Sequence, residues 1–502
     1  MSNYRLSINR SAYYIHNYNL GDSPSLERAL SVYDFISRKY THHGFIYDEK
    51  NKILKIPSGL DIDILLGKLC SDGIAITNIE NKSGEFIESR RANKLKCSAQ
   101  PRDKFQEEAI EFIVAENASD SKRKQRLVTL DTGFGKTVCA IISVIKMKMP
   151  AIIISLNLSD QWIERLKAFT DGELDKDIFY LKSWNDIDKL VNMKHPPMGS
   201  FYVIGLDAMI AALRDDGEKL HKFYEKFGIG VQIFDESHLH FLKIINVLVN
   251  TSVERILFLS ATPSRSERSQ DLLYRRLFTQ NIPSYGEDTH TINKYNIISV
   301  KYRTKPSFFD NYRVQPRRGV HAVAYFKYMF KYPKRYYILI DIIRYFTLRI
   351  FKIHEFDKNK KVIIYIQNLK GIKLVKDILE KNLPEIDGFK PTVGDYSGNV
   401  DKKDRHIQLK NNIILTTYAN NAGLDIDGLI MIINLIPMSS EILLKQIRGR
   451  LRDKKGYYVD ACDIGFDGMI RQRDKRMINH KKNARSIVYY EHDGNNIQKS
   501  FS

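Results

Sequence analysis

The sequence predicts an α/β fold with two parallel-sheet domains in tandem and a small mixed α/β domain in front of them. From Phe105 onward, short runs rich in Ile and Val alternate with helical segments, and the same rhythm returns from about residue 355. Apolar runs without polar alternation are typical of parallel strands that are buried on both faces. Two such blocks therefore indicate two α/β domains. The runs are RLVTL, AIIIS, FYVIG, VQIF and ILFLS in the first block, and KVIIYI, NIILTT and MIINLI in the second.

Three domains are expected along the chain. Residues 1–98 form the small domain, in which YRLSI and AYYIHNY are predicted strands and SLERALSVYDFISRKY is a predicted amphipathic helix. Residues 99–292 and 293–502 form the two parallel-sheet domains. Residues 295–345 are rich in Tyr, Phe, Lys and Arg, and we interpret them as the connection that leads into the second core.

The composition predicts a folded intracellular protein. Apolar residues make up 43% of the 502 residues, which is enough for substantial cores. No apolar run reaches the ~20 residues that a membrane-spanning helix needs, and MSNYRLSINRSAYY lacks the apolar stretch of a secretory signal. The four cysteines form no CxxC pair, so a disulfide framework or a zinc site is not expected, and a reducing compartment fits.

The formal charge of +20 favours polyanionic partners. Lysines and arginines that neutralise phosphates release condensed counterions, and this release drives binding to nucleic acid. A basic protein without such a partner is the alternative, because net charge argues about partners and not about the fold.

A glycine loop between a strand and a helix is the first candidate site. In LVTLDTGFGKTVCAIISVIK, Gly133 and Gly135 let the backbone turn so that its N–H groups point at a phosphate, and the helix start adds positive potential. Lys136 would reach the β- and γ-phosphates of a nucleotide, and Thr137 would bind Mg²⁺. Leu130 stands where the general pattern GxxxxGK[ST] has its first glycine. A glycine turn before an ordinary helix is the alternative.

Two carboxylates follow the strand VQIF. Asp235 and Glu236 stand at its carboxyl end, which is the edge where open α/β sheets bind ligands. Asp235 would hold Mg²⁺, and Glu236 would polarise the attacking water. Paired acids after a strand also serve as ordinary helix N-caps, so both interpretations stay open at this point.

The third candidate site is QIRGRLR in the second block. Arg450 could stabilise charge on the γ-phosphoryl group in the transition state, and such arginines accelerate the reaction by about 10³–10⁵. Gln446 would contact the nucleotide or the hydrolytic water. An arginine-rich helix start on a solvated surface is the alternative.

The order of these sites gives the pattern its specificity. SATPSR, which begins at Ser260, follows the acid pair, and TTYANNAGLDID, which begins at Thr416, precedes QIRGRLR. From Phe105 to the C-terminus, the chain resembles superfamily 2 helicases. LDTGFGKT resembles motif I, DESH motif II of the DExH branch, SATPSR motif III, VIIYIQNLKGIKLV motif IV, GLDID the core of motif V and QIRGRLR motif VI. The resemblance implies two RecA-like domains whose shared cleft hydrolyses ATP while both hold nucleic acid.

The resemblance implies ATP and Mg²⁺ as cofactors. FQEEAIEFI resembles the adenine-reading segment, with Gln106 after the aromatic Phe105. The catalytic residues that the resemblance implies are Lys136, Asp235, Glu236, Gln446 and Arg450, and the metal ligands are Thr137 and Asp235. The nucleotide-binding residues are Phe105, Gln106, Thr132, Gly133, Phe134, Gly135, Lys136, Thr137, Gly423 and Asp425.

Contacts with nucleic acid are expected from strand ends in both blocks. SLNLSDQWIERL resembles the DNA-contacting segment after motif I, and small polar side chains at strand ends contact phosphates without reading sequence. The expected residues are Asn157, Ser159, Gly205, Thr416 and Thr417. The residues expected to couple nucleotide and nucleic acid are His238, Ser260 and Thr262.

Two further segments are basic. The aromatic and basic residues 302–337 could stack bases while Lys and Arg follow the phosphate backbone. A plain hydrophobic core is the alternative for these aromatic side chains. RQRDKRMINHKKNAR, near the C-terminus, offers more cations, and a solvated helix face is the alternative there.

Motif VI departs from the family pattern in one respect. The usual QxxGRxxR would place an arginine at position 453, but Asp453 stands there and Arg452 lies one place earlier. Arg450 is therefore the expected arginine finger, and the role of Arg452 is open.

The predicted function is that of an ATP-dependent DNA helicase or translocase that unwinds or remodels duplex or branched DNA. The motif forms and the small N-terminal domain are similar to the viral branch of UvsW-like phage helicases and poxviral transcript-release helicases. This branch implies a monomer that acts on single-stranded or forked DNA beside proteins of replication, recombination or transcription, in the host cytoplasm if the chain is viral. The alternatives are an RNA helicase, a translocase that displaces transcript or protein without strand separation, and a non-catalytic scaffold.

Overall fold

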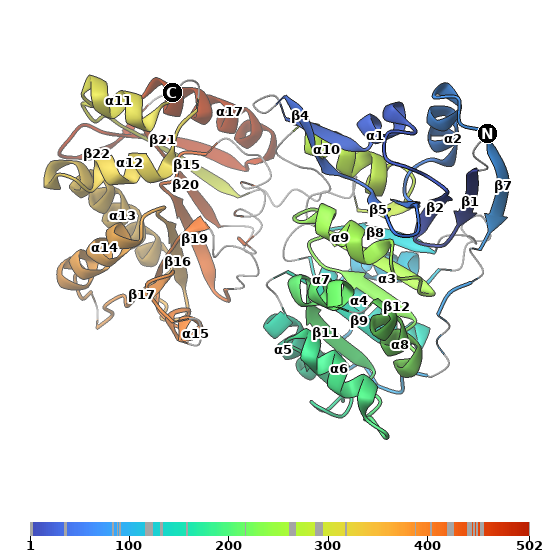
Figure 1. The fold of residues 1–502 in the computed structure, drawn as a ribbon. Helices are drawn as coiled ribbons and strands as arrows, with labels where there is room; N and C mark the ends of the chain where they lie inside the picture. Colours follow the sequence, from blue (N-terminus) through green and yellow to red (C-terminus); the bar gives the residue numbers. More distant parts are fainter. Residues whose placement is uncertain are drawn as a thin grey trace. The chain divides into compact units, whose positions relative to one another are not determined.

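The chain forms two compact units, residues 1–290 and residues 291–502. In Figure 1 the first unit runs from blue to yellow-green and the second from yellow to red. A computed structural model describes residues 4–34, 38–82, 85–87, 89, 92–115, 124–130, 134–156, 159–215, 217–260, 268–286, 295–316, 319–386, 388–401, 404–418, 426–438, 444, 447, 450–451 and 456–500. Among the helices in these ranges, none is long and apolar enough to cross a lipid bilayer.

A five-stranded mixed sheet opens the first unit. Its strands are β1 (Tyr4–Ile8), β2 (Ala12–His16), β5 (Ile46–Asp48), β6 (Ile53–Pro57) and β7 (Ile76–Asn81). They lie in the order β5-β6-β2-β1-β7, and all neighbours are antiparallel except β1 and β7. The accompanying elements are the hairpin of β3 (Ser31–Asp34) and β4 (Lys39–His43) and the helices α1 (Pro24–Ala29) and α2 (Ile62–Ser71).

The predicted amphipathic helix over SLERALSVYDFISRKY is wrong beyond its first turns. Helix α1 ends at Ala29, and Ser31–Asp34 is strand β3, which pairs with β4. Leu30 and Val32 are both buried, so the apolar spacing that suggested a helix spans a helix end and a strand. β-Branched and aromatic residues such as Val32 and Tyr33 favour a strand once a partner strand is available.

The N-terminal sheet and the first large sheet share one hydrophobic core. Buried polar contacts also join them, since the Ser11 hydroxyl donates to the Thr251 carbonyl at 2.6 Å and the Gln125 amide donates to the Arg10 carbonyl at 2.8 Å. The first 82 residues therefore fold against the first large sheet as part of one unit. The predicted division at residue 98 stays a prediction.

The first large sheet contains seven parallel strands. They are β8 (Gln125–Thr129), β9 (Ala151–Ser155), β10 (Ile178–Leu181), β11 (Phe201–Gly205), β12 (Val231–Phe234), β13 (Arg255–Ser260) and β14 (Ser284–Tyr285). Their order is β10-β11-β9-β12-β13-β8-β14. Every residue of β8, β9, β12 and β13 is buried, as expected of strands covered on both faces.

Helices connect these strands. They are α3 (Lys104–Val114), α4 (Lys136–Met147), α5 (Ser159–Phe169), α6 (Trp184–Asn192), α7 (Leu206–Asp215), α8 (Gly217–Phe227), α9 (Phe241–Leu248) and α10 (Arg268–Tyr274), and α10 continues as a π-helical turn, Arg275–Thr279.

The second unit is built on an eight-stranded sheet. Its strands are β15 (Asn296–Tyr302), β16 (Lys361–Tyr365), β17 (Val393–Tyr396), β18 (Ile413–Thr416), β19 (Leu429–Asn434), β20 (Tyr457–Asp463), β21 (Ser486–His492) and β22 (Ile497–Ser500). In the order β17-β18-β16-β19-β20-β15-β21-β22, all neighbours are parallel except β21 and β22. The helices are α11 (Phe308–Val314), α12 (Ala322–Met329), α13 (Pro333–Ile353), α14 (Leu369–Asn382), α15 (Arg405–Gln408) and α17 (Asp467–Asn483). Two large parallel sheets and a small mixed sheet confirm the predicted α/β fold class.

The predicted inter-domain connection over residues 295–345 is wrong, because the segment belongs to the second core. Its first residues form β15, which lies between β20 and β21. Tyr302 and Tyr325 are fully buried, and their hydroxyl oxygens lie 2.5 Å apart. The run NIISV is rich in Ile and Val, as a buried strand is. The aromatic and basic residues that follow it led to the interpretation as a connection.

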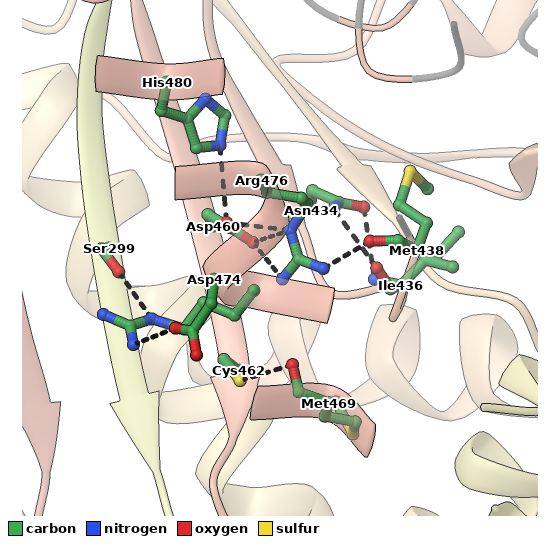
Figure 2. A network of polar contacts seen from close by, with 11 residues as sticks. Ser299, Asn434, Ile436, Met438, Asp460, Cys462, Met469, Asp474, Arg476 and His480 are labelled. Carbon is green, nitrogen blue, oxygen red and sulfur yellow. Dashed lines mark hydrogen bonds and ion pairs between the residues drawn. The ribbon is translucent and has the colours of Figure 1, made fainter. Parts of the chain in front are cut away.

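A buried ion pair holds helix α17 against the sheet (Figure 2). The Arg476 guanidinium donates to both carboxylate oxygens of Asp460 at 2.9–3.1 Å and also to the Met438 carbonyl, while His480 Nε2 lies 3.5 Å from Asp460. Burial raises the pKa of Asp460, but Arg476 and His480 outweigh it and hold that pKa well below its ordinary value. The basic C-terminal stretch is therefore not wholly a solvated face, because Arg476 and His480 point into the core.

We predict that Arg476→Met destabilises the second unit by about 3–5 kcal/mol, because the substitution leaves the Asp460 carboxylate buried without its partner. Urea unfolding followed by circular dichroism measures the loss. Arg471→Met, on the exposed side of the same helix, is the control and should change little. The double variant Arg476→Met/Asp460→Leu should recover most of the stability, and a double variant as unstable as the single one would contradict this account of the pair.

Candidate functional site

The carboxyl ends of five neighbouring strands bring the candidate residues of the first unit to one edge. Because β8, β13, β12, β9 and β11 are adjacent and parallel, the segments that follow them start side by side. The residues at or just after these ends are Leu130, Ser260, Asp235, Ser155 and Gly205. The expected nucleotide segments and nucleic-acid segments of this unit thus share one edge.

The glycine loop leads directly into helix α4. Gly135 has φ 86° and is the N-cap of α4, and a Cβ atom there would lie 2.4 Å from Nε2 of Gln106. Both the left-handed backbone and the close approach require glycine. Lys136 begins α4, and its ammonium donates to the Leu130 carbonyl at 2.9 Å. The positive charge of Lys136 therefore lies beside the residue that follows β8. Thr137 lies in the first turn of α4. Thr132 and Gly133 lie outside the described residues.

Gln106 supports this loop from helix α3. Its amide nitrogen donates to the Phe134 carbonyl at 2.8 Å, and its amide oxygen accepts from the backbone N–H of Arg102 at 2.7 Å. The Asp103 carboxylate caps α3 by accepting from the backbone N–H of Gln106 at 3.0 Å. The side chain expected to read adenine therefore also fixes the loop in this structure. Phe105, beside it, is half-buried.

The acid pair lies directly after β12. The backbone N–H of Glu236 donates to Oδ1 of Asp235 at 2.9 Å, and the indole N–H of Trp162 donates to Oδ2 at 2.8 Å. Burial and the Glu236 carboxylate raise the pKa of Asp235 to about 6, while Trp162 and Lys136 act to lower it. Glu236 has φ 49°, a strained backbone for a non-glycine residue, as is common at functional sites.

A buried histidine joins the acid pair to the next strand. Nδ1 of His238 and the Ser260 hydroxyl lie 2.9 Å apart, and the same nitrogen is 3.5 Å from Oε2 of Glu236. His238 and Ser260 are both buried. The end of β13 is thus in direct contact with the residues that follow β12. Thr262 lies outside the described residues.

The expected nucleic-acid contacts of the first unit differ in their surroundings. The hydroxyl of Ser159, at the start of α5, lies 3.0 Å from that of Ser155, and Ser159 is buried. In this structure Ser159 therefore binds the end of β9. Gly205 has no atom within 4 Å of the position of a Cβ, so its backbone lies open to a ligand. Asn157 lies outside the described residues.

The second unit gathers its candidate residues at the carboxyl ends of β16, β17 and β18. Thr416 and Thr417 are buried, and the Thr416 hydroxyl donates to the Tyr396 carbonyl at 2.7 Å. Burial raises the pKa values of Tyr365 and Tyr396, and the charge of Arg450 acts to lower both. Gln446, Gly423, Asp425 and Arg452 lie outside the described residues.

Sequence reasoning missed Trp162. It lies within SLNLSDQWIERL, whose polar residues are the ones expected to contact nucleic acid. Its indole N–H donates to Asp235, the carboxylate expected to hold the metal. A tryptophan at a buried position of an otherwise polar amphipathic helix was the only signal, since its partner lies 73 residues further along the chain.

Comparisons with known proteins agree with the α/β fold described above. Residues 100–265 match the family of type III restriction enzyme res subunits. The fold is similar to that of Dbp5 from S. cerevisiae bound to RNA and ADP BeF3, with a TM-score of 0.50 and 12% identity over 78% of this chain and 90% of that chain. No curated protein gives a significant sequence match.

Two further solved structures are similar at lower scores. They are the Hef helicase domain of Pyrococcus furiosus, with a TM-score of 0.44 and 14% identity over 75% of this chain and 98% of that chain, and T4 UvsW, with a TM-score of 0.35 and 14% identity over 98% of this chain and 100% of that chain. Of these three structures, Dbp5 is the one whose score bears on the fold.

The likeness to Dbp5 supports a fold of two RecA-like parallel-sheet domains in tandem.

Proposed function

We propose that the chain is a nucleic-acid-stimulated ATPase of the superfamily 2 helicase type that tracks along DNA and unwinds or remodels it. The observation that carries the proposal is the electrostatic cluster at the carboxyl edge of the first sheet. Asp235 follows β12 at this edge, where the Trp162 indole and the Glu236 backbone N–H donate to its carboxylate. Lys136 of the glycine loop donates to the Leu130 carbonyl just after β8, a strand of the same sheet. A pair of acids beside a glycine loop and its lysine is the arrangement that phosphoryl transfer to water uses.

Each member of the cluster has a proposed role. Lys136 and the loop N–H groups bind the β- and γ-phosphates, and Glu236 orients the attacking water. Asp235 and Thr137 offer the hard oxygen ligands that Mg²⁺ prefers, and Trp162 holds the carboxylate in place, so these residues fit that ion. The charge that bound Mg²⁺ supplies neutralises the phosphoryl oxygens.

The remaining expected residues complete this proposal. Phe105 and Gln106 would bind adenine, and Gln106 has to exchange its hydrogen bond with Phe134 or keep it while the base binds beside it. Arg450 would stabilise the transition state from the second unit. Gln446, Gly423 and Asp425 keep their proposed contacts with the nucleotide.

The proposed nucleic-acid residues are Asn157, Ser159, Gly205, Thr416 and Thr417, with His238, Ser260 and Thr262 as the link to the nucleotide. The hydrogen bond between His238 and Ser260 supports this link, because a shift of the acid pair would reach the end of β13. We further propose that DNA is the favoured substrate and that the chain belongs to the viral UvsW-like and poxviral branch. It would act as an intracellular monomer beside replication, recombination or transcription proteins.

ATPase activity with single-stranded DNA, duplex DNA, forked DNA and RNA tests the proposal. We expect low turnover without nucleic acid and a large increase with single-stranded or forked DNA. Stimulation by RNA alone would instead support the RNA helicase, and stimulation by DNA without strand displacement on a fork would support a translocase. Absence of any stimulation would contradict the proposed function.

Glu236→Gln should retain ATP binding and slow hydrolysis by about 10²–10⁴-fold, because the amide cannot take a proton from water. Single-turnover hydrolysis and nucleotide-binding fluorescence measure the two effects. Glu218→Gln is the matched control, since its side chain is 88% exposed on helix α8. Near-normal hydrolysis in the Glu236 variant would refute the role of this residue.

Trp162→Phe should raise the Mg²⁺ concentration for half-maximal hydrolysis by about 10–100-fold, because it removes the hydrogen bond that orients the Asp235 carboxylate. The chain contains a matched control, since its other tryptophan, Trp184, donates its indole N–H to Asp215. Trp184→Phe should leave the Mg²⁺ titration unchanged. Equal titration curves for the two variants would show that Trp162 only fills space.

A further inference from the structure

A cluster of aromatic side chains stands exposed on helix α11 in the second unit. Phe308, Phe309 and Tyr312 are 81%, 74% and 69% exposed, and the rings of Phe308 and Phe309 lie 6.0 Å apart. Spacings of three and four residues place Tyr312 beside both phenylalanines on one side of the helix. Isolated exposed apolar residues are ordinary, but three large aromatic rings together mark a binding surface.

The helix that carries these rings is firmly anchored. Val314, on its opposite side, is buried, and the Gln315 side chain accepts from the backbone N–H of Gly468. Ser307 and Asp310 form a capping box at its start, and Asp310 also lies 3.8 Å from the guanidinium of Arg335. The rings are therefore presented by a fixed element, and their exposure does not arise from a loose chain end.

The sequence around the rings is predominantly cationic. Residues 301–337 contain ten lysines and arginines and a single carboxylate, Asp310, whose contacts with Ser307 and Arg335 are internal. The exposed cations nearest in sequence to the rings are Arg303, Lys305 and Arg313. Exposed aromatic rings next to exposed cations are complementary to a polyanion that also offers flat apolar faces.

The position of α11 relates it to the proposed nucleic-acid residues of the same unit. Strand β15 leads to α11 through residues 303–307, and β15 is parallel to β18 in one sheet, so both strands end at the same edge. Three strands separate them, which corresponds to roughly 19 Å at about 4.8 Å per strand spacing. The rings therefore follow a strand that ends at the same edge of the sheet as the strand that carries Thr416.

We propose that Phe308, Phe309 and Tyr312 form a stacking platform for the bases of single-stranded nucleic acid, with Arg303, Lys305 and Arg313 holding its phosphates. Stacking requires unpaired bases, so the platform binds a single strand and not an intact duplex. The inference deepens the proposed function, because it adds a binding site for the same substrate class. It does not depend on ATP hydrolysis.

The test compares the full chain with the triple variant Phe308→Ala/Phe309→Ala/Tyr312→Ala. Binding of fluorescent oligothymidylate, without nucleotide and at fixed salt, should weaken at least about tenfold, since each lost base stack has an effect of that size. The control Leu20→Ala/Ile79→Ala/Met193→Ala removes exposed apolar side chains from the first unit and should bind like the wild type. An oligouridylate arm separates a general strand platform, weakened equally, from one restricted to DNA.

A second measurement reports stacking directly. Phe309→Trp should show fluorescence quenching by oligothymidylate beyond that of the wild type, whose only tryptophans are Trp162 and Trp184. Wild-type affinity in the triple variant together with unquenched Phe309→Trp overturns the proposal, and the surface would then serve a protein partner.

The two proposals can fail separately. Ring-dependent binding without DNA-stimulated ATPase in the wild type would refute the proposed function and leave the platform standing. DNA-stimulated ATPase in the wild type with ring-independent binding would refute the platform alone.

Discussion

The structure of the candidate site depends on one constraint: a carboxylate is buried at the carboxyl edge of a parallel sheet and must be stabilised there. Burial raises the pKa of Asp235, and the neighbouring Glu236 raises it further. The Trp162 indole, the Glu236 backbone N–H and the Lys136 ammonium favour the charged form. These groups come from α5, from the turn after β12 and from α4, so stabilising one carboxylate requires three segments to converge. A cation beside Asp235 would relieve the same electrostatic cost, which supports the proposed Mg²⁺ site.

Much of this edge could be predicted from the sequence, because parallel strands leave a strong local signal. The uninterrupted apolar runs located β8, β12 and β13, and the candidate residues follow those runs directly along the chain. Gly135, Lys136, Asp235 and Glu236 were therefore placed without knowledge of the strand order. The physical reason is general, since the carboxyl ends of adjacent parallel strands meet at one edge whatever lies between them.

Features that depend on distant partners could not be predicted in this way. Trp162 and Asp235 are 73 residues apart, and the buried pair of Arg476 and Asp460 turns a basic segment inward that charge alone would place on the surface. The wrong helix after Ala29 has the same origin, because the strand that starts at Ser31 exists through its pairing with β4. Local pattern cannot specify such contacts, since each residue's preference changes once its partner is present.

The aromatic residues between 302 and 337 illustrate how one composition serves two purposes. Tyr302 and Tyr325 are fully buried and join the sheet to α12, while Phe308, Phe309 and Tyr312 stand out from α11. A core and a stacking surface are the alternative interpretations of this segment. Tyr302 and Tyr325 belong to the core, and the exposed rings of α11 are available for the stacking that we propose. A fold that only needed core volume would have no use for three solvated rings, whose burial against a partner would remove unfavourable apolar area from water. Because their surroundings are cationic and their helix is anchored, a single strand with unpaired bases is the partner whose chemistry matches both features.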